Sequence, residues 1–351
     1  MRILLTGGCG FIGSAVIRHL IRHTDHTVVN VDKMTYAASE DALEEARHDR
    51  RHTLVRADIT DVAAMAQVFA THQPDAVMHL AAESHVDRSI DGPAPFIATN
   101  ITGTFVLLDA ARAYWSALAP AAKAAFRFHH ISTDEVFGAL GPSDPPFTET
   151  TPYDPRSPYS ASKAASDHLV RAWFHTYGLP AFVTNTTNNY GPWQFPEKLI
   201  PLVTLNAIEG RPLPVYGDGT NTRDWLFVDD HAAALVLALQ HAAPGDTLAI
   251  GAQQPRSNLQ VVHAICDIVD ELSPDPAGPR RRLIQFVTDR PGHDFRYEID
   301  PARTTAALGW TAPHGFDAGL RRTIAWYRDH APWWQAIRTA KYEGQRLGSA
   351  A

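Results

Sequence analysis

A glycine-rich turn near the start of the chain most constrains its fold. An apolar run at 3–5 predicts a short strand, residues 11–23 predict a helix, and the segment that joins them is Thr6-Gly7-Gly8-Cys9-Gly10-Phe11-Ile12-Gly13. Glycine permits a tight turn and a close approach of the backbone to a pyrophosphate at a helix N-terminus, which favours anions. The spacing G-x-x-G-x-x-G is weak alone, but the strand before it and the helix after it indicate a dinucleotide site.

Strand-like and helical segments alternate through the first half of the chain. Further strands are predicted at 27–31, 53–57, 76–80, 126–132 and 181–184, and helices at 62–71, 101–115 and 158–177. Short β-rich runs separated by helices indicate a parallel sheet with helices on both faces. We therefore expect an α/β protein built on a doubly wound parallel sheet of the Rossmann type.

Beyond Asn188 the chain becomes rich in proline and glycine, which predicts a second, smaller, loop-rich domain. A helix at 227–241 and a strand at 247–250 are expected to return the chain to the main sheet, and a further helix is predicted at 258–272. The expected division assigns residues 1–187 and 226–250 to the first domain, and residues 188–225 and 251–351 to the second.

Composition narrows the classes of partner. The formal net charge is −7, which argues against a general nucleic-acid partner. The two cysteines, Cys9 and Cys266, provide neither a disulfide framework nor a metal-ligand spacing, so a cytoplasmic protein without a metal site is expected. No apolar run approaches the ~20 residues that span a bilayer, and the first strand follows Met1 too closely for a signal peptide. We therefore expect no membrane partner.

The residue at the end of the second strand bears on the cofactor. Asp32 lies 19 positions after Gly13. A carboxylate there can bind the ribose hydroxyls of adenosine and would repel a 2′-phosphate, which favours NAD over NADP. Lys33 weakens this argument slightly, and an ordinary turn residue is the alternative interpretation of Asp32. Asp58, after the third strand, is a second candidate for the adenine side.

Tyr159 and Lys163 are spaced i, i+4 and so share a face of the predicted helix at 158–177. Ser157 and Pro158 are typical of an N-cap and a first helical residue, which puts Tyr159 in the first turn. A neighbouring ammonium group lowers the pKa of a tyrosine. Tyr159 could then take a proton from a hydroxyl while a nicotinamide accepts the hydride.

Thr133, Asp134 and Glu135 follow the strand predicted at 126–132. Ligands of open α/β sheets bind at the carboxyl ends of the strands, so these side chains are candidates for the same site. A solvated acidic turn is the alternative. An acid and a base side by side near a nicotinamide would permit elimination of water beside a carbonyl group.

With these residues the chain resembles the extended short-chain dehydrogenase/reductases and, more narrowly, the dTDP-glucose 4,6-dehydratases. The resemblance runs from residue 1 to about residue 335. Beside the Thr133-Asp134-Glu135 triplet it rests on segments 80–89, 188–192 (NNYGP), 195–201 (FPEKLIP), 223–225 (RDW) and 289–294 (DRPGHD). The related epimerases share the glycine loop and YxxxK but carry no Asp-Glu pair after the threonine.

The resemblance implies a role for each catalytic candidate. Tyr159 would be the base at the C4 hydroxyl, with Lys163 as its electrostatic partner, and Thr133 would hold the C4 oxygen. Glu135 would remove the C5 proton, and Asp134 would protonate the departing C6 hydroxyl. The implied reaction converts dTDP-glucose to dTDP-4-keto-6-deoxyglucose and water, with NAD as cofactor and internal hydride transfer from C4 to C6.

The resemblance also implies two sets of binding residues. The first domain would bind NAD through Gly7, Gly10, Phe11, Ile12, Gly13, Asp32, Lys33, Thr35, Asp58, Ile59, Leu80, Ala81, Ala82, Ser84, Thr99, Tyr159, Lys163 and Asn189. The sugar nucleotide, held largely by the second domain, would contact Ser84, Thr133, Asn188, Lys198, Leu199, Pro214, Tyr216, Arg223, Asn258, Arg290 and His293. Arg223 is the candidate clamp for the diphosphate, because a guanidinium matches phosphate oxygens; a surface ion pair with Asp224 or Asp218 is the alternative.

The helices at 101–115 and 160–177 carry apolar residues at helical spacing, and the resemblance implies that they pair with their copies in a homodimer.

Three residues, Phe137, Gln194 and Ala98, depart from the family pattern. Gln194 borders the nucleotide side and bears on thymidine selectivity. A nucleotide-sugar C4 epimerase, a 4,6-dehydratase of another nucleotide sugar, and a catalytically silent NAD-binding protein remain as alternatives.

Overall fold

The computed structural model describes residues 1–289, 292–340 and 342. Within them, seven parallel strands form the larger sheet in the order β10-β6-β5-β4-β1-β2-β3. The strands are β1 Arg2–Thr6, β2 Thr27–Asp32, β3 His52–Arg56, β4 Ala76–His79, β5 Arg127–Thr133, β6 Ala181–Thr186 and β10 Thr247–Ile250. The strand order reverses between β1 and β4, where open α/β sheets form a crevice for ligands. The predicted doubly wound parallel sheet is confirmed.

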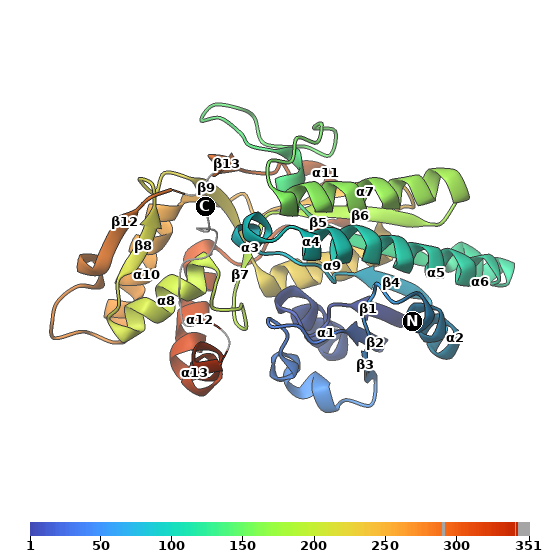
Figure 1. Cartoon of the computed structure of the whole chain (residues 1–351), viewed down its shortest axis with the longest axis horizontal. Helices are drawn as coiled ribbons and strands as arrows, with labels where there is room; N and C mark the ends of the chain where they lie inside the picture. The colour runs from blue at the N-terminus through green and yellow to red at the C-terminus, as the bar shows by residue number, and fades with distance from the viewer. Residues whose placement is uncertain (290–291, 341, 343–351) are drawn as a thin grey trace.

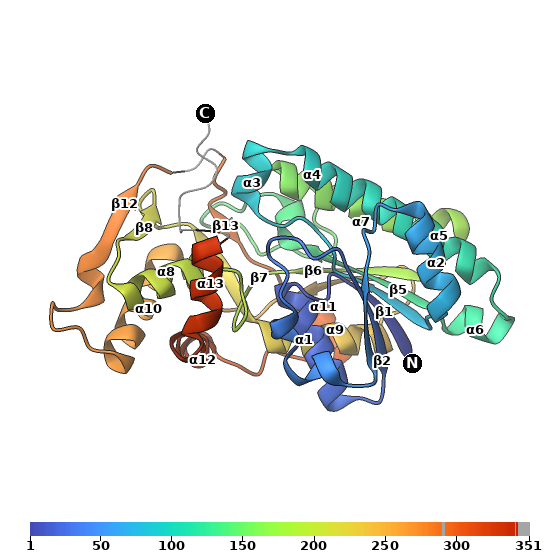
Figure 2. The same cartoon turned by 60° about the horizontal axis from the view of Figure 1, so that its bottom comes forward.

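Helices cover both faces of this sheet (Figures 1 and 2). Ile3 and Leu5 point into the core beneath one set of helices, while Leu4 points into the core on the other face, because side chains of a strand alternate. The first face carries α1 Phe11–His23, α9 Val228–His241 and the 3₁₀ segment η1 Glu40–His48; the second carries α2 Val62–His72, α5 Thr104–Ser116 and α7 Pro158–Tyr177.

The second, smaller domain lies beyond the carboxyl edge of the sheet, at the left of Figure 1. It holds a four-stranded sheet of β7 Asn188–Tyr190, β9 Thr222–Phe227, β11 Pro255–Ser257 and β13 Arg296–Tyr297, and a pair of β8 Leu213–Tyr216 with β12 Ile284–Val287. Helices α8 Leu199–Glu209, α10 Asn258–Leu272 and α12 Phe316–Asp329 pack on these strands, and α13 Ala331–Ala340 follows. The proline and glycine content predicted this domain but none of its strands.

The remaining elements are short. They are α3 Val86–Asp91, α6 Pro120–Ala125, η3 Asp134–Phe137, η4 Arg280–Leu283 and α11 Ala302–Leu308. Although α11 falls in the chain segment expected for the second domain, it packs against α9 and β10 of the larger sheet. The predicted helix at 258–272 is confirmed, whereas β3 begins and ends one residue earlier than predicted.

The helix predicted at 101–115 is longer than expected. Helix α4 Ala94–Phe96, the π-helical segment η2 Ile97–Gly103 and α5 form one run, Ala94–Ser116, that is long and apolar enough to cross a membrane by length and composition. The expectation that no apolar segment approaches this length is therefore wrong. Half of its most apolar 18-residue window is buried inside the molecule, the run packs against α2 and α7, and a core helix passes the same test of length and composition.

Candidate active site

The glycine loop between β1 and α1 has the geometry that its sequence predicts. Gly7 has φ 76°, in the left-handed region, and a Cβ there would lie 2.8 Å from the backbone of Ala81. A Cβ at Gly13 would overlap the carbonyl oxygen of Gly7, so that α1 can begin this close to the turn only with glycine. The loop therefore brings bare backbone to the N-terminus of α1, where anions are favoured.

Asp32 closes the other side of this loop. Its carboxylate accepts hydrogen bonds from the backbone N–H of Cys9, at 2.9 Å, and of Met34, at 2.8 Å. Burial raises the pKa of Asp32, and these two hydrogen bonds act against burial. The carboxylate is thus fixed at the end of β2, beside the glycine turn. Lys33 lies 3.6 Å from Asp58 Oδ2 and donates to Thr99 Oγ1 at 3.2 Å, which connects three of the expected cofactor residues.

A single cavity of about 320 Å³ joins the glycine loop to the end of β5. It is lined by most residues expected from the sequence: Gly7, Gly10, Phe11, Ile12, Gly13, Asp32, Lys33, Thr35, Ile59, Leu80, Ala81, Ala82, Ser84, Thr99, Thr133, Asp134, Glu135, Tyr159, Lys163, Asn188, Asn189 and Lys198. The residues come from the loop after β1, the start of α1, the end of β2, the segments after β3 and β4, η2, the end of β5, η3, α7 and the start of the second domain. The fold therefore brings the expected cofactor loop and the expected catalytic side chains to one place.

The strand end at Thr133 positions two acids. Thr133 caps η3: its hydroxyl accepts from the backbone N–H of Glu135 and lies 3.3 Å from Asp134 Oδ1. Asp134 is 1% exposed, and burial together with the neighbouring Glu135 raises its pKa well above the ordinary value. Burial therefore favours the protonated form of Asp134, whereas Glu135 is only partly buried. The alternative of a solvated acidic turn is not what the structure shows.

Tyr159 lies in the first turn of α7, as its sequence context predicts. Ser157 and Ser160 form a reciprocal capping box, with Ser157 Oγ accepting from Ser160 N at 3.0 Å. Burial and the charge of Glu135 raise the pKa of Tyr159, and a hydrogen bond with Thr133 acts in the other direction. The sequence spacing predicts the opposite direction, because it takes account of Lys163 but not of burial.

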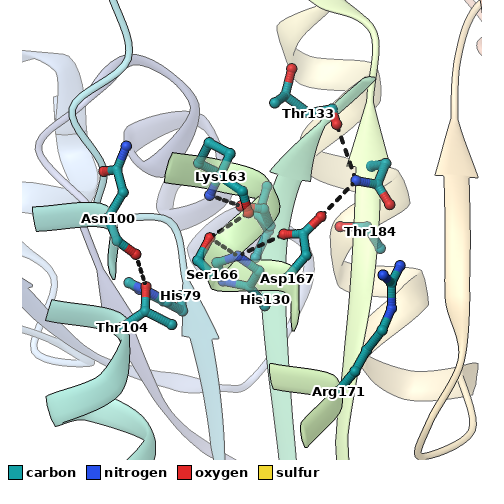
Figure 3. Close-up of polar contacts among 12 residues, drawn as sticks. His79, Asn100, Thr104, His130, Thr133, Lys163, Ser166, Asp167, Arg171 and Thr184 are labelled. Carbon is teal, nitrogen blue, oxygen red and sulfur yellow. Dashed lines mark hydrogen bonds and ion pairs between the residues drawn. The ribbon is translucent and has the colours of Figure 1, made fainter. Parts of the chain in front are cut away.

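Lys163 is buried on the same face of α7. Its ammonium group donates to the carbonyl oxygen of Ile131 on β5 at 2.9 Å (Figure 3). Burial lowers the pKa of Lys163 to about 8. The lysine thus points toward the carboxyl end of β5, where Thr133 lies.

Most of the expected sugar-nucleotide residues that the structure describes in the second domain do not line the main cavity. Arg223 is buried over the ring of Tyr297, at 4.2 Å from its centre, and donates to the carbonyl oxygens of Thr222 and Asp294 at 2.7 and 2.9 Å. Asp224 accepts from three backbone amides, at 252–254, and a buried Arg223 is not half of a surface pair. The positive charge of Arg223 lowers the pKa of Asp134, so the guanidinium acts on the acid pair.

Several expected residues lie outside the main cavity. Lys198, which lines the main cavity, reaches back from the second domain, and its Nζ donates to the carbonyl oxygen of Ser84 at 3.0 Å. His293 contacts Asp289 at 2.6 Å and lines a neighbouring hollow with Arg156. Among the described residues, those that do not line the main cavity are Asp58, Leu199, Pro214, Tyr216, Arg223, Asn258 and His293. Arg290 lies outside the described residues.

Sequence reasoning missed a cluster at the mouth of the cavity. Glu197 accepts from the Tyr36 hydroxyl at 2.9 Å and from Arg88 Nε at 2.8 Å, and the Arg88 guanidinium lies 4.1 Å from the centre of the Tyr36 ring. These side chains come from positions 36, 88 and 197, and no local pattern joins them. The described residues hold no group of three or more His, Cys, Asp or Glu side chains that could bind a metal ion.

Comparisons with known proteins agree with this geometry. The family model described as GDP-mannose 4,6 dehydratase matches residues 4–323. The dTDP-glucose 4,6-dehydratase of Neisseria meningitidis is 57% identical, over 99% of each chain, and dTDP-glucose 4,6-dehydratase 1 of Escherichia coli K12 is 56% identical, over 98% of this chain and 97% of its own.

Solved structures agree with these sequence comparisons. DesIV, a dTDP-glucose 4,6-dehydratase of Streptomyces venezuelae with NAD bound, superposes with a TM-score of 0.87 at 39% identity, over 96% of this chain and all of its own. The UDP-glucose 4-epimerase of Thermotoga maritima has a TM-score of 0.82 at 27% identity, over 94% of this chain and all of its own. The fold is thus shared with epimerases, while full-length identity above one half is found with the dehydratases. This chain belongs to the nucleotide-sugar 4,6-dehydratases and, among them, to the family of the dTDP-glucose 4,6-dehydratases.

Proposed function

We propose that this protein is an NAD-dependent dTDP-glucose 4,6-dehydratase, which converts dTDP-glucose to dTDP-4-keto-6-deoxyglucose and water. The observation that carries the proposal is the placement of Thr133, Asp134, Glu135 and Tyr159 on one cavity with the glycine loop. A redox site alone would serve an epimerase. The two adjacent acids, one buried with a raised pKa and one partly exposed, add the groups that an elimination needs.

The residues of the first domain fit NAD. A Cβ at Gly13 would fill the turn that must admit a pyrophosphate, and Asp32 offers a fixed carboxylate to a ribose. A 2′-phosphate would meet that carboxylate, so NAD rather than NADP is the expected form. Lys33, Thr35, Ile59, Leu80, Ala81, Ala82, Ser84, Thr99 and Asn189 would line the remainder of the site, and Asp58 would act through Lys33. When bound, NAD would supply a hydride acceptor and donor at the sugar.

The side chains at the end of β5 then have separate tasks. Tyr159 would take the proton of the C4 hydroxyl, with the Thr133 hydrogen bond lowering its pKa and Lys163 as its proposed electrostatic partner. Glu135 would remove the proton at C5, which the C4 carbonyl makes acidic. Asp134, whose pKa is raised by burial, would give its proton to the C6 hydroxyl as it leaves as water. The two acids therefore exchange one proton each with the substrate.

The second domain would hold the nucleotide. We keep the division of residues 188–225 and 251–351 for the sugar nucleotide and 1–187 and 226–250 for NAD, although α11 packs on the sheet of the NAD domain. Lys198 and Asn188 line the shared cavity, and Arg223 has the charge to meet a diphosphate near Asp134. Leu199, Pro214, Tyr216, Asn258, Arg290 and His293 are retained as candidates for the same ligand.

An isotope experiment separates this activity from its alternatives. Substrate deuterated at C4 should give a 4-keto product with deuterium in its C6 methyl group and no net consumption of added NAD. Deuterium that stays at C4 of an epimerised sugar would instead identify an epimerase, and an unchanged sugar would identify a silent binding protein. UDP-glucose and GDP-mannose, tested in parallel, decide the nucleotide preference, on which Gln194 bears.

We also propose that the protein is a cytoplasmic homodimer. Apolar side chains stand exposed along the run Ala94–Ser116 and at the end of α7: Ile97 at 46%, Phe105 at 45% and Tyr177 at 45%. These two helices lie side by side on the outer face of the sheet (Figure 2). Pairing with a second copy would cover both. A monomer mass by light scattering at micromolar concentration would contradict the assembly.

A further inference from the structure

A buried carboxylate lies behind the reactive side chains, and the proposed chemistry does not use it. Asp167 follows Lys163 by four positions on α7, so the two share a face of the helix. Its side chain is fully buried where α7 packs on β5 and β6 (Figure 3). A buried charge is unfavourable unless it is paired and hydrogen-bonded, so its neighbours indicate its role.

Three groups meet the carboxylate of Asp167. His130 Nε2 on β5 lies 3.2 Å from Oδ1, while the Tyr153 hydroxyl and the Asn185 side-chain amide donate to Oδ2 at 2.8 and 3.1 Å. Burial acts to raise the pKa of Asp167, but the neighbouring His130 and the charge of Lys163 outweigh it, and the pKa lies below its ordinary value. Asp167 is therefore charged at neutral pH.

His130 does not balance this charge. Burial and the nearby Lys163 lower the pKa of His130 to about 4, so its imidazole is neutral at neutral pH. Arg171 donates to the Tyr153 hydroxyl, at 2.7 Å, rather than to the carboxylate. Lys163 is the buried cation beside Asp167, and the charge of Asp167 is what opposes the effect of burial on the lysine. The two charges therefore act on each other through space: each favours the charged form of the other.

Asp167 also has a connection to the strand end. The Asn185 amide that donates to Asp167 also donates to the backbone carbonyl oxygen of Thr133 at 3.0 Å. The same carboxylate therefore shares a face of α7 with Lys163 and is connected through Asn185 to the strand end at Thr133. We propose that Asp167 is a positioning residue: its carboxylate is the buried counter-charge of Lys163 and, through Asn185, it holds the strand end that carries Thr133. The catalytic consequence of this link rests on the proposed function, but the link itself does not.

Titratable groups face this pair from each element packed around it. They are His79 on β4, His130 on β5, Tyr153 in the loop before α7, and Tyr159 and Arg171 on α7. Burial and His130 lower the pKa of His79 well below its ordinary value, and burial and Asp167 raise that of Tyr153. Lys163, with a pKa of about 8, titrates in the range where the enzyme would be assayed.

The direct test is the titration of Lys163 in Asp167→Asn, which removes the charge and keeps the shape. The chain has five lysines, so lysine labelled with ¹³C at Cε gives few signals, and Lys163→Met assigns the relevant one. We expect the titration midpoint of Lys163 to fall by about one pH unit or more, because an ammonium group loses its counter-charge. The measurement is made on the purified full chain, with and without NAD.

Asp230→Asn is the matched control. Asp230 is also a buried carboxylate, it accepts from His314 Nδ1 at 2.6 Å, and it lies outside the candidate site. The control should leave the Lys163 titration unchanged. A Lys163 midpoint in Asp167→Asn that equals that of the unmodified protein would overturn the proposal.

Activity adds a second readout. If Lys163 must be protonated, the alkaline limb of the kcat/KM profile in Asp167→Asn should move to lower pH by the same shift as the lysine. Asn185→Ala should lower kcat without moving the profile. A uniform loss of activity with an unmoved profile in Asp167→Asn would argue for a merely structural carboxylate. If the unmodified protein does not dehydrate dTDP-glucose, the proposed function fails, while the lysine titration still decides this inference.

A double-mutant cycle, measured by thermal unfolding, tests the proposal even if Asp167→Asn does not fold. The double variant Lys163→Met/Asp167→Asn removes both charges, so neither is left unpaired in the interior. It should be more stable than the sum of the two single changes predicts, and should fold even where a single variant does not. Additive losses would show that the two charges are not coupled and would contradict the proposal.

Discussion

Burial governs where the protons of the candidate site reside. Asp134 and Tyr159 both lie in the interior next to Glu135, and in each case burial and this carboxylate raise the pKa. For Asp134 the direction suits a general acid, which must hold a proton before it gives one. For Tyr159 the direction opposes a general base, so Thr133 and Lys163 have to offset the effect of burial.

Removal of the Tyr159 hydroxyl tests that assignment. Tyr159→Phe should lower kcat by about 10²–10⁴-fold, because the base at C4 is lost. The ring remains, edge-on to Phe96 with centroids 6.4 Å apart, so folding and NAD binding should change little. Activity within a few-fold of the unmodified enzyme would remove Tyr159 from the proposed mechanism.

Substitutions of Glu135 and Asp134 should block different steps of the reaction. Glu135→Gln should block removal of the C5 proton, so solvent deuterium should not enter C5 of the sugar. Asp134→Asn should slow the loss of water but leave C5 exchange comparatively intact. NMR of recovered substrate in deuterated water distinguishes the two. If both variants lose only substrate affinity, the carboxylates are binding residues.

Asp134 also makes stability depend on pH. Its pKa is raised in the folded state, so its contribution to the free energy of unfolding is full below the unfolded pKa and is lost as the pH rises. Asn cannot ionise, so Asp134→Asn should gain stability relative to the unmodified protein as the pH increases, by up to about 1.4 kcal/mol per pH unit. Thermal unfolding at pH 5 and pH 8 measures the difference, and an equal gap at both values would contradict the raised pKa.

At the start of α1, substitution by alanine should affect stability differently at two glycines of the same turn. A Cβ at Gly13 would overlap the Gly7 carbonyl oxygen, whereas a Cβ at Gly10 would lie 3.2 Å from it. Gly13→Ala should therefore destabilise the fold by about 1–3 kcal/mol and abolish NAD binding, because the overlap is with backbone that cannot yield easily. Gly10→Ala should fold nearly normally and weaken NAD binding through its closer approach to the pyrophosphate. Thermal unfolding and calorimetric titration with NAD check both.

Elements defined by local chemistry were predicted well. The cap at Ser157, the first turn that holds Tyr159 and the helix at 258–272 all follow from residues close in sequence. The strands of the second domain were not predicted. The three residues of β7 pair with β9 from more than 30 positions away, and strands this short carry no periodicity of their own.

At the scale of the whole molecule, the sequence predicts those parts of the cavity that are formed by local sequence motifs. The glycine loop, Asp32 and the Thr133 triplet each lie at a strand end, and the parallel sheet gathers strand ends on one edge. Contacts between distant segments could not be predicted from the sequence: Tyr36 and Glu197 are 161 positions apart. Asp167 could have been found, because it follows Lys163 at helical spacing, but its buried partners on β5 and β6 could not.

The contacts of Glu197 join the two domains, which leads to a last prediction. The Glu197 side chain is 2% exposed and accepts from Tyr36 and Arg88 of the first domain. Glu197→Ala leaves both donors without this acceptor in a partly buried place, so we expect a loss of about 1–3 kcal/mol in the free energy of unfolding. Because Lys198 follows directly and donates to Ser84 across the same gap, the KM for the sugar nucleotide should also rise.

Glu271→Ala is the control. Glu271 pairs with Arg321 on the surface, and the two side chains are 61% and 46% exposed. Its removal should lower the free energy of unfolding by less than about 1 kcal/mol and leave KM unchanged. Equal losses of stability in the two variants would show that Glu197 does not hold the domains together.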